Sequence, residues 1–410
     1  MKNKLLAALL TATMVASTLT GCGSSNDVAS DTQGTDSTTT SDATASDSTS
    51  STDSASGTIK IGTISPNTGA LAAYGEAVVN AMNLAVEEIN TAGGILGQQV
   101  ELESLDDKGD STEGANAFNK LADESNVCAV IGSVTSGVTT GLAPLADESK
   151  IVLLTPTATA DTVTDSDDYV FRACFKDSYQ GKMAAKFASE TLGVKKVAVL
   201  YASGDAYSAG LREAFVAAAK EFGLEIVSEE SSSSVDDTEY SSQLTNIANS
   251  GAEFLFAPYY YSSIGPYIVP QARSAGFEGV IMGADGFDGT IGTMVEDKSL
   301  YNNCYFTNHY SPDDTSEAVQ SFVSAYTTKY SADSLNALGA LAYDSVYMLA
   351  QSIEKAGSTD RTEIRDAMSK MTFSGVTGDF TLDSTGTPEK SVAIIEFKDG
   401  VAVWNSTIGN

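Results

Sequence analysis

Histidine is nearly absent from this chain, which has a single one, His309, in 410 residues. No Ser-His-acid arrangement can be supported around it, and no glycine-rich phosphate loop of Walker spacing occurs. Asp106 and Asp107 are adjacent, but no further carboxylate or histidine cluster stands at metal-ligand spacing. We therefore expect a protein that is not an enzyme and that has neither a metal site nor a cofactor.

Positive charge is also scarce. The chain has 23 Lys and Arg against 54 Asp and Glu, a formal net charge of −31, and its basic residues form no cluster. Because nucleic-acid binding depends on basic patches that neutralise phosphates, this balance argues against a nucleic-acid partner. The acidity is typical of a protein that stays dissolved in an extracellular setting.

Only four cysteines are present, and one of them, Cys22, belongs to an N-terminal motif described below. The other three, Cys128, Cys174 and Cys304, are odd in number and lack short spacings, which argues against a disulfide framework or a metal site. Cys128 lies in an apolar run and is interpreted as a buried free thiol. Cys174 and Cys304 could pair only if the fold brings them together.

Long apolar runs are missing except at the start of the chain. Residues 1–22 combine a basic beginning, an apolar stretch from Leu5 to Leu19 and small residues before Cys22, which describes a secretory signal. The ending Leu19-Thr20-Gly21-Cys22 resembles the bacterial lipoprotein box, which implies acylation of Cys22. We therefore expect a lipid-anchored protein on the extracytoplasmic face of the bacterial cell membrane. No other segment is apolar for long enough to span a bilayer.

Residues 23–56 are almost wholly Ser, Thr, Asp, Ala and Gly, without positive charge. Such a composition cannot bury enough apolar surface to order itself. We predict a disordered tether between the anchor and the folded part, spanning roughly 30 Å as a flexible coil.

The stretch from 127 to 160 organises the rest of the chain. Two apolar runs, Val127 to Ile131 and Ile151 to Leu154, are bounded by turn residues and predict buried parallel strands. The hydroxyl residues Ser136, Thr157 and Thr159 follow these strands. They would lie at one edge of the sheet, where the first turn of a helix can hold an anion.

No Lys or Arg occurs between Val127 and Glu148, so neutral donors would have to hold the anion. The alternative is that these hydroxyls only cap helices, as Ser and Thr commonly do.

The pattern around this stretch alternates strands with helices in two consecutive series, which predicts two doubly wound α/β lobes. The further predicted strands are 59–64, 99–105 and 169–172 in the first series and 196–201, 225–230, 254–257 and 280–283 in the second. Pro266 and Pro270 fall in the helix expected after Tyr261, and Pro270 should kink it or shift its start. Helices at 315–330, 335–355 and 361–371 could complete the first lobe, with chain crossings near Cys174, Tyr305 and Thr372.

An ordered set of motifs then carries a resemblance. The motifs are Ser65-Pro66-x-Thr68-Gly69, Tyr74-Gly75, Glu87-Glu88-Ile89-Asn90, Asp106-Asp107, Val130-Ile131-Gly132 with Ser136-Gly137, Thr155-Pro156-x-Ala158-Thr159, Tyr169-Val170-Phe171-Arg172, Gln180-Gly181, Tyr207, Gln271-Ala272-Arg273, Gly283-Ala284-Asp285-Gly286 and Gly375-Val376-Thr377-Gly378. From Gly57 to Asn410 the chain resembles the solute-binding proteins of branched-chain amino acid ABC importers. The resemblance covers nearly the whole of that segment.

The resemblance implies the type I periplasmic-binding-protein fold, in which two doubly wound lobes are joined by a three-strand hinge and close on a ligand. The implied first lobe is 57–174 with 308–371, and the second is 175–307 with 372–410. The matching positions imply a carboxylate site at Ser136, Thr157 and Thr159, and an ammonium site at Asp285.

The same resemblance implies a pocket lined by Tyr74, Tyr207 and one of Tyr260 or Tyr261. Arg172 would lie beside the hinge, where we expect it to form a structural ion pair.

The resemblance implies that the protein captures an amino acid, with a branched-chain one as the first guess. It would deliver this ligand to ABC permease subunits and their ATPases. We expect the protein to be a monomeric lipoprotein. Asp205 and the run Tyr259 to Tyr261 would also allow a polar or aromatic ligand. An amide, an aromatic acid or another small solute therefore stays open as the cargo. A sensor of the same fold, working with a separate membrane receptor, is the other alternative.

Overall fold

The computed structural model describes residues 57–165 and 168–409. The predicted signal segment 1–22, its Cys22 and the predicted tether 23–56 lie outside the described residues. Within the described ranges, no helix combines the length and the apolar character needed to cross a membrane.

The first lobe is built on a five-stranded sheet in the order β2-β1-β3-β4-β5, whose neighbouring strands are all parallel. Its strands are β1 (Thr58–Ser65), β2 (Gln99–Asp106), β3 (Ala129–Ile131), β4 (Val152–Thr155) and β5 (Val170–Arg172). Each predicted strand of this series overlaps an observed one, with ends that differ by at most two residues. β3 and β4 are buried along their whole length, which explains why they appear in the sequence as continuous apolar runs.

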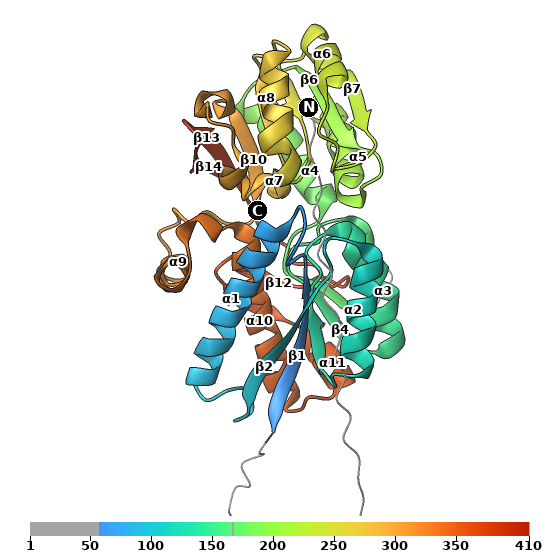
Figure 1. Ribbon diagram of the computed structural model, residues 1–410, viewed down its shortest axis with the longest axis vertical. Coiled ribbons are helices and arrows are strands. Elements are labelled where there is room, and N and C mark those ends of the chain that lie inside the picture. The colour runs from blue at the N-terminus through green and yellow to red at the C-terminus, as the bar shows by residue number, and fades with distance from the viewer. Residues whose placement is uncertain (1–56, 166–167, 410) are drawn as a thin grey trace, which may run out of the picture. The chain divides into compact units, whose positions relative to one another are not determined.

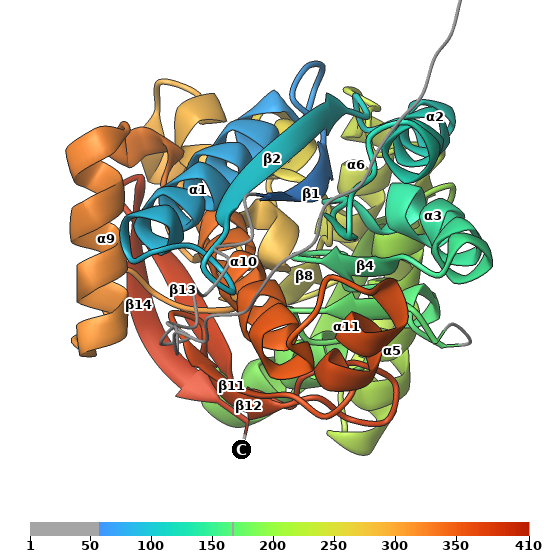
Figure 2. The ribbon, with the colours of Figure 1, turned by 90° about the horizontal axis from the view of Figure 1, so that it is seen from below.

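Helices cover both faces of this sheet (Figure 1). α2 (Ser111–Asp123) and α3 (Ser136–Ser149) share a core with Val130 and Leu153. On the other face, α1 (Ala72–Thr91) and α10 (Ala337–Ala356) share a core with Ile131 and Leu154. Figure 2 shows α1 and α10 side by side, and they are in extensive contact. Helices from the C-terminal third, which also include α9 (Glu317–Lys329) and α11 (Arg361–Met368), thus complete the lobe that the N-terminal strands begin.

The second lobe contains a seven-stranded sheet in the order β14-β13-β10-β9-β8-β6-β7, which is parallel except for β13. Its strands are β6 (Lys196–Ala202), β7 (Glu225–Ser232), β8 (Phe254–Phe256), β9 (Val280–Gly283), β10 (Cys304–Asn308), β13 (Val392–Lys398) and β14 (Val401–Ile408). The sequence pattern did not predict β10. It ends in Thr307 and Asn308, which are polar but buried.

The helices of the second lobe also lie on both faces of its sheet (Figure 1). α4 (Asp177–Lys186) and α5 (Ala206–Glu221) cover one face, where the ring of Phe215 stacks 4.4 Å from that of Phe256. α6 (Ser241–Asn249) and α8 (Val269–Ser274) cover the other. The predicted irregularity near the prolines is confirmed, because a π-helical turn at Ile264–Ile268 separates the short α7 (Tyr261–Ser263) from α8.

The chain passes between the two sheets three times. The first passage follows β5 and the second follows β10. The hairpin of β11 (Thr372–Gly375) and β12 (Gly378–Thr381) is joined to α10, since the Asp344 carboxylate accepts hydrogen bonds from the N–H groups of Val376 and Thr377. The boundary predicted at residue 372 would put this hairpin in the second lobe. We propose instead that the third crossover is 382–391, which leads into β13.

The cysteines of the described region are free and buried, so Cys174 and Cys304 do not pair. Burial raises the pKa of each of these two thiols to about 12. Cys128 is a buried free thiol, as predicted.

Candidate functional site

A small cavity lies where segments that follow strands of both sheets meet. Its volume is about 20 Å³, little more than one water molecule needs. Its lining residues are Tyr74, Val134, Thr135, Ser136, Thr157, Tyr207, Tyr260, Asp285, Gly286 and Leu338. Six of the eight predicted ligand-binding residues are among them. Thr159 and Tyr261 are not.

The first-lobe wall presents neutral hydrogen-bonding groups. Ser136 is the first residue of α3, and its Oγ accepts a hydrogen bond from the N–H of Ala160 at 3.1 Å, which leaves its own proton free to be donated. The hydroxyl of Thr157 donates instead to the carbonyl of Val134 at 2.7 Å. Thr157 would therefore serve an anion mainly through its N–H group, which now makes only a long hydrogen bond of 3.4 Å to Thr155 Oγ1. With no Lys or Arg in the lining, the first turn of α3 is the electropositive part of this wall.

Thr159 lies behind this wall and is fully buried. Its carbonyl accepts hydrogen bonds from Arg172 Nη1 at 2.9 Å and from the N–H of Asp177 at 2.9 Å. Arg172 also donates to the carbonyls of Ala158 and Ala160 and to the hydroxyl of Thr164. Arg172 thus holds the loop that carries Thr157 in place. The partners of Arg172 are carbonyls and a hydroxyl, so the predicted structural ion pair is replaced by hydrogen bonds to this loop.

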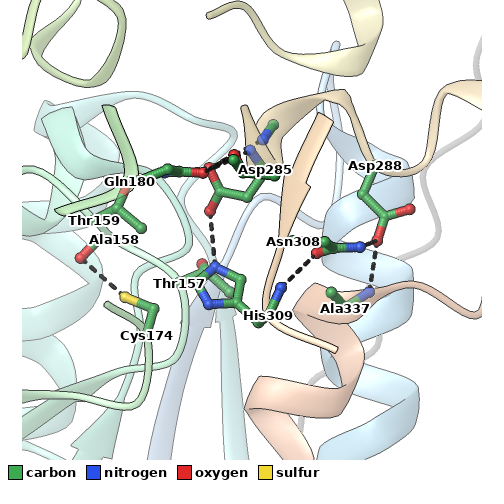
Figure 3. Close-up of polar contacts among 12 residues, drawn as sticks. Thr157, Ala158, Thr159, Cys174, Gln180, Asp285, Asp288, Asn308, His309 and Ala337 are labelled. Carbon is green, nitrogen blue, oxygen red and sulfur yellow. Dashed lines mark hydrogen bonds and ion pairs between the residues drawn. The ribbon is translucent and has the colours of Figure 1, made fainter. Parts of the chain in front are cut away.

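The second-lobe wall is centred on the carboxylate of Asp285, which is 3% exposed and follows β9 (Figure 3). Its Oδ1 accepts hydrogen bonds from Gln180 Nε2 at 3.1 Å, from the hydroxyl of Tyr207 at 2.9 Å and from the N–H of Gly286 at 3.1 Å. Its Oδ2 lies 3.0 Å from Nε2 of His309. This carboxylate is therefore fixed by donors from α4, α5 and the segment after β10.

Sequence reasoning missed two residues of this group. Gln180 appeared only as part of a family motif, although it bonds Asp285 through its amide and accepts a hydrogen bond from Thr307. His309 has no catalytic partner in the sequence, and no motif assigns it a ligand role. Its position just after a polar strand end was the available signal.

Three tyrosines line the cavity, Tyr74, Tyr207 and Tyr260, and Tyr261 packs beside them without lining it. The rings of Tyr207 and Tyr260 stack at 5.0 Å, and Tyr74 meets the edge of Tyr261 at 4.7 Å. The Tyr74 hydroxyl donates to the carbonyl of Gly286 at 2.5 Å, which joins α1 of the first lobe to the second. Tyr261 makes a second junction, since its hydroxyl donates to the carbonyl of Ala70 at 3.0 Å. Burial raises the pKa values of Tyr74, Tyr207 and Tyr260 well above the ordinary value, so their hydroxyls stay protonated.

Another acid lies close behind the site. Asp177, in the first turn of α4, is buried, and burial together with the negative charge of Asp285 raises the pKa of its carboxyl. A wider chamber of about 660 Å³ shares Thr135 and Tyr260 with the small cavity. Among the described residues, no group of three or more His, Cys, Asp or Glu is placed to hold a metal ion.

The family of the chain follows from its match to known proteins. The family model described as periplasmic binding protein matches residues 58–402. The chain belongs to the periplasmic binding protein family. The family match and the solved relatives of this periplasmic binding protein confirm the predicted α/β fold. The cavity is lined by residues of both lobes.

The relatives of this periplasmic binding protein cover most of its length. The Leu/Ile/Val-binding protein BraC3 of Rhizobium johnstonii is 34% identical over 338 residues, which are 78% of this chain and 88% of that protein. A leucine binding protein of Thermotoga maritima has a TM-score of 0.79 and 34% identity, with 85% of this chain and 98% of that chain covered. The substrate binding protein LivJ of a branched-chain amino acid transporter from Streptococcus pneumoniae, solved with isoleucine, has a TM-score of 0.78 and 33% identity, with coverages of 86% and 99%.

Proposed function

We propose that this periplasmic binding protein captures an amino acid between its lobes and delivers it to the permease of an ABC importer. One observation carries the proposal. A carboxylate on the second lobe, Asp285, and the N-terminal turn of α3 on the first lobe line the same cavity. An amino acid is a small dipolar molecule whose two charges fit these opposite walls.

The ligand carboxylate would bind the first lobe. Ser136 Oγ has a proton to donate, because its hydrogen bond with Ala160 uses it as an acceptor. The N–H groups of Thr157 and of the first turn of α3 would add further donors. An anion at the N-terminus of a helix is stabilised without a cationic side chain.

The ligand ammonium would bind Asp285 on the second lobe. Each charge would be fully paired only when both lobes approach. The ligand would therefore shift the equilibrium between open and closed forms by its differential affinity for the closed form. The closed form would then dock on the permease.

The two walls would hold the charged groups of the ligand, and the identity of its side chain is inferred from the relatives. The relatives' names make leucine, isoleucine and valine the first candidates. A cavity of about 20 Å³ must widen to take such a side chain. The adjoining chamber, which begins at Thr135 and Tyr260, offers space in that direction.

The decisive variant is Asp285→Asn, which removes the charge and keeps the size of the side chain. A hydrogen bond to a charged group contributes about 1.5–3 kcal/mol, so we expect a loss of affinity of roughly 10- to 150-fold by calorimetry. Asp297→Asn is the matched control, because Asp297 is an exposed acid of the same lobe whose helix cap an Asn can keep. Unchanged affinity in Asp285→Asn would reject the assignment.

The ligand itself can be found by a thermal-shift screen of the full-length protein against the amino acids and a panel of small amides and aromatic acids. A ligand that binds only the folded state raises its midpoint. A shift with aromatic acids alone would replace the amino-acid assignment by an aromatic cargo.

We further propose that the protein is a monomer anchored by acylated Cys22 on the extracytoplasmic face of the cell membrane. The motif ending in Cys22 and the family membership support this location. Cys22→Ser should release the protein from the membrane fraction, and persistence of that variant in the fraction would contradict the anchor. Light scattering of the purified protein checks the oligomeric state.

A further inference from the structure

The only histidine of the chain lies against the carboxylate proposed to bind the ammonium group. His309 Nε2 is 3.0 Å from Asp285 Oδ2, and both side chains are withdrawn from solvent, at 0% and 5% exposure. The imidazole stacks on the ring of Phe175 with centroids 3.8 Å apart. Figure 3 shows the ring lying below the carboxylate, with its Nε2 pointing toward it.

The hydrogen bonds define the protonation state of this ring. The proposed ammonium site requires an ionised Asp285, and an ionised carboxylate can only accept hydrogen bonds, so in that site Nε2 carries the proton that it shares with Asp285. The other nitrogen, Nδ1, is buried and has no hydrogen-bond partner in the described part of the chain. A proton there would be a buried donor without an acceptor, which is costly. The geometry therefore favours the neutral ring with its proton on Nε2.

The charges around the ring point the same way. Lys390, on the third crossover, opposes a positive charge on His309, whereas Asp285 favours one, and burial is the largest influence, so the pKa of His309 is lowered. Cys174, from the first crossover, stays an uncharged thiol because burial raises its pKa to about 12. Gln180 Nε2, which bonds Asp285, also lies 3.5 Å from Oδ1 of Asp177, whose pKa is raised by burial.

A neutral His309 leaves the charge of Asp285 uncompensated. A protonated His309 would form an ion pair with it and cancel the charge that an ammonium group needs. We propose that His309 is a positioning residue that turns the Asp285 carboxylate toward the cavity, keeps its negative charge available, and so makes the site selective for a ligand with an ammonium group. This inference rests on the proposed function.

The first test needs no ligand. Because the chain has one histidine, ¹⁵N-labelled full-length protein without an affinity tag gives a single imidazole spin system. We expect the Nε2–H form at neutral pH and a titration midpoint below the ordinary value of about 6.5. The Nδ1–H form, or a midpoint at or above that value, would overturn the proposal.

The second test uses two substitutions and the amino acid that gives the largest thermal shift. His309→Gln keeps an N–H donor but does not titrate, so its dissociation constant at pH 7.5 should stay within a few-fold of wild type. His309→Leu has no donor and should bind at least tenfold more weakly at every pH. Circular dichroism and the thermal midpoint of each variant confirm that it is folded.

The pH profile separates positioning from a merely structural role. Below the pKa of His309, the wild-type dissociation constant should rise as the pH falls, by up to about tenfold per pH unit because one proton competes with the ligand. His309→Gln should lack this rise. Equal profiles in the two proteins would refute the inference while leaving amino-acid binding intact. No binding of any amino acid by wild type would reject the proposed function and this inference together.

Discussion

Tyr261 offers a test of how closure contributes to affinity. Its hydroxyl donates to the carbonyl of Ala70 and accepts a hydrogen bond from the N–H of Ala73, so α7 of the second lobe is bonded to the beginning of α1 in the first. α1 has no side-chain cap from its own N-cap residue, Leu71. The other lobe therefore supplies a partner for one of the N–H groups that the start of every helix leaves unpaired.

The substitution Tyr261→Phe removes both hydrogen bonds and leaves the ring in place. In the open form the groups that lose their partner are hydrated, so the loss falls on the closed form alone. Each hydrogen bond contributes about 0.5–1.5 kcal/mol net, so the pair contributes about 1–3 kcal/mol to closure. A binding-competent form that is less populated weakens the apparent affinity in proportion, here by roughly 5- to 150-fold. Tyr261 does not line the cavity, so no ligand contact is lost with it.

Calorimetry with the best amino-acid ligand measures the affinity, and small-angle scattering of the ligand-free protein measures how open it is. The matched control is Tyr169→Phe, which removes a hydrogen bond to Thr362 at 3.2 Å between two segments of the first lobe. The control should lower the stability to unfolding without changing the affinity. If Tyr261→Phe bound as tightly as wild type, or if the control weakened binding equally, closure would not depend on this junction.

Two further predictions concern Lys390, on the third crossover, and Gly75, at the beginning of α1. The pKa of Lys390 is lowered to about 8 by burial, so between pH 8 and 10 the unfolded chain binds more protons than the folded one. The stability of wild type should therefore rise with pH by up to about 3 kcal/mol relative to Lys390→Met. Parallel curves of thermal midpoint against pH would contradict this. In Gly75→Ala the new Cβ would come within 2.3 Å of the Pro66 carbonyl oxygen. This clash should lower the free energy of unfolding, measured by urea titration, by about 1–3 kcal/mol. An unchanged denaturation midpoint would show that the loop at Pro66 moves aside without cost.

Much of the fold could be predicted because local patterns and tertiary structure agree in it. The apolar runs at 127–131 and 151–154 are short, continuous and bounded by turn residues, and both are buried parallel strands. Residues that follow such strands lie at one edge of the sheet. The positions of Ser136, Thr157 and Asp285 beside the cavity follow from that rule.

The rest depended on contacts that sequence patterns do not encode. Gln180 and His309 reach Asp285 from 105 and 24 residues away, and although the polar end of β10 marks the neighbourhood of His309, it does not identify Asp285 as the partner. The choice between Tyr260 and Tyr261 depends on the extended backbone of Tyr260 just before α7. This change from extended to helical backbone directs the ring of Tyr260 into the cavity and the ring of Tyr261 toward the opposite lobe.

The order in which the chain builds its two sheets limits how the molecule can be divided. The strands β13 and β14, which extend the second sheet beyond β10, follow α9, α10 and α11 in the chain, which belong to the first lobe. A single protease cut at the first or the second crossover therefore separates segments that belong to the same lobe. Neither lobe is encoded by one continuous stretch of the gene. A chimaera that combines the lobes of two such proteins therefore needs three junctions, one at each crossover.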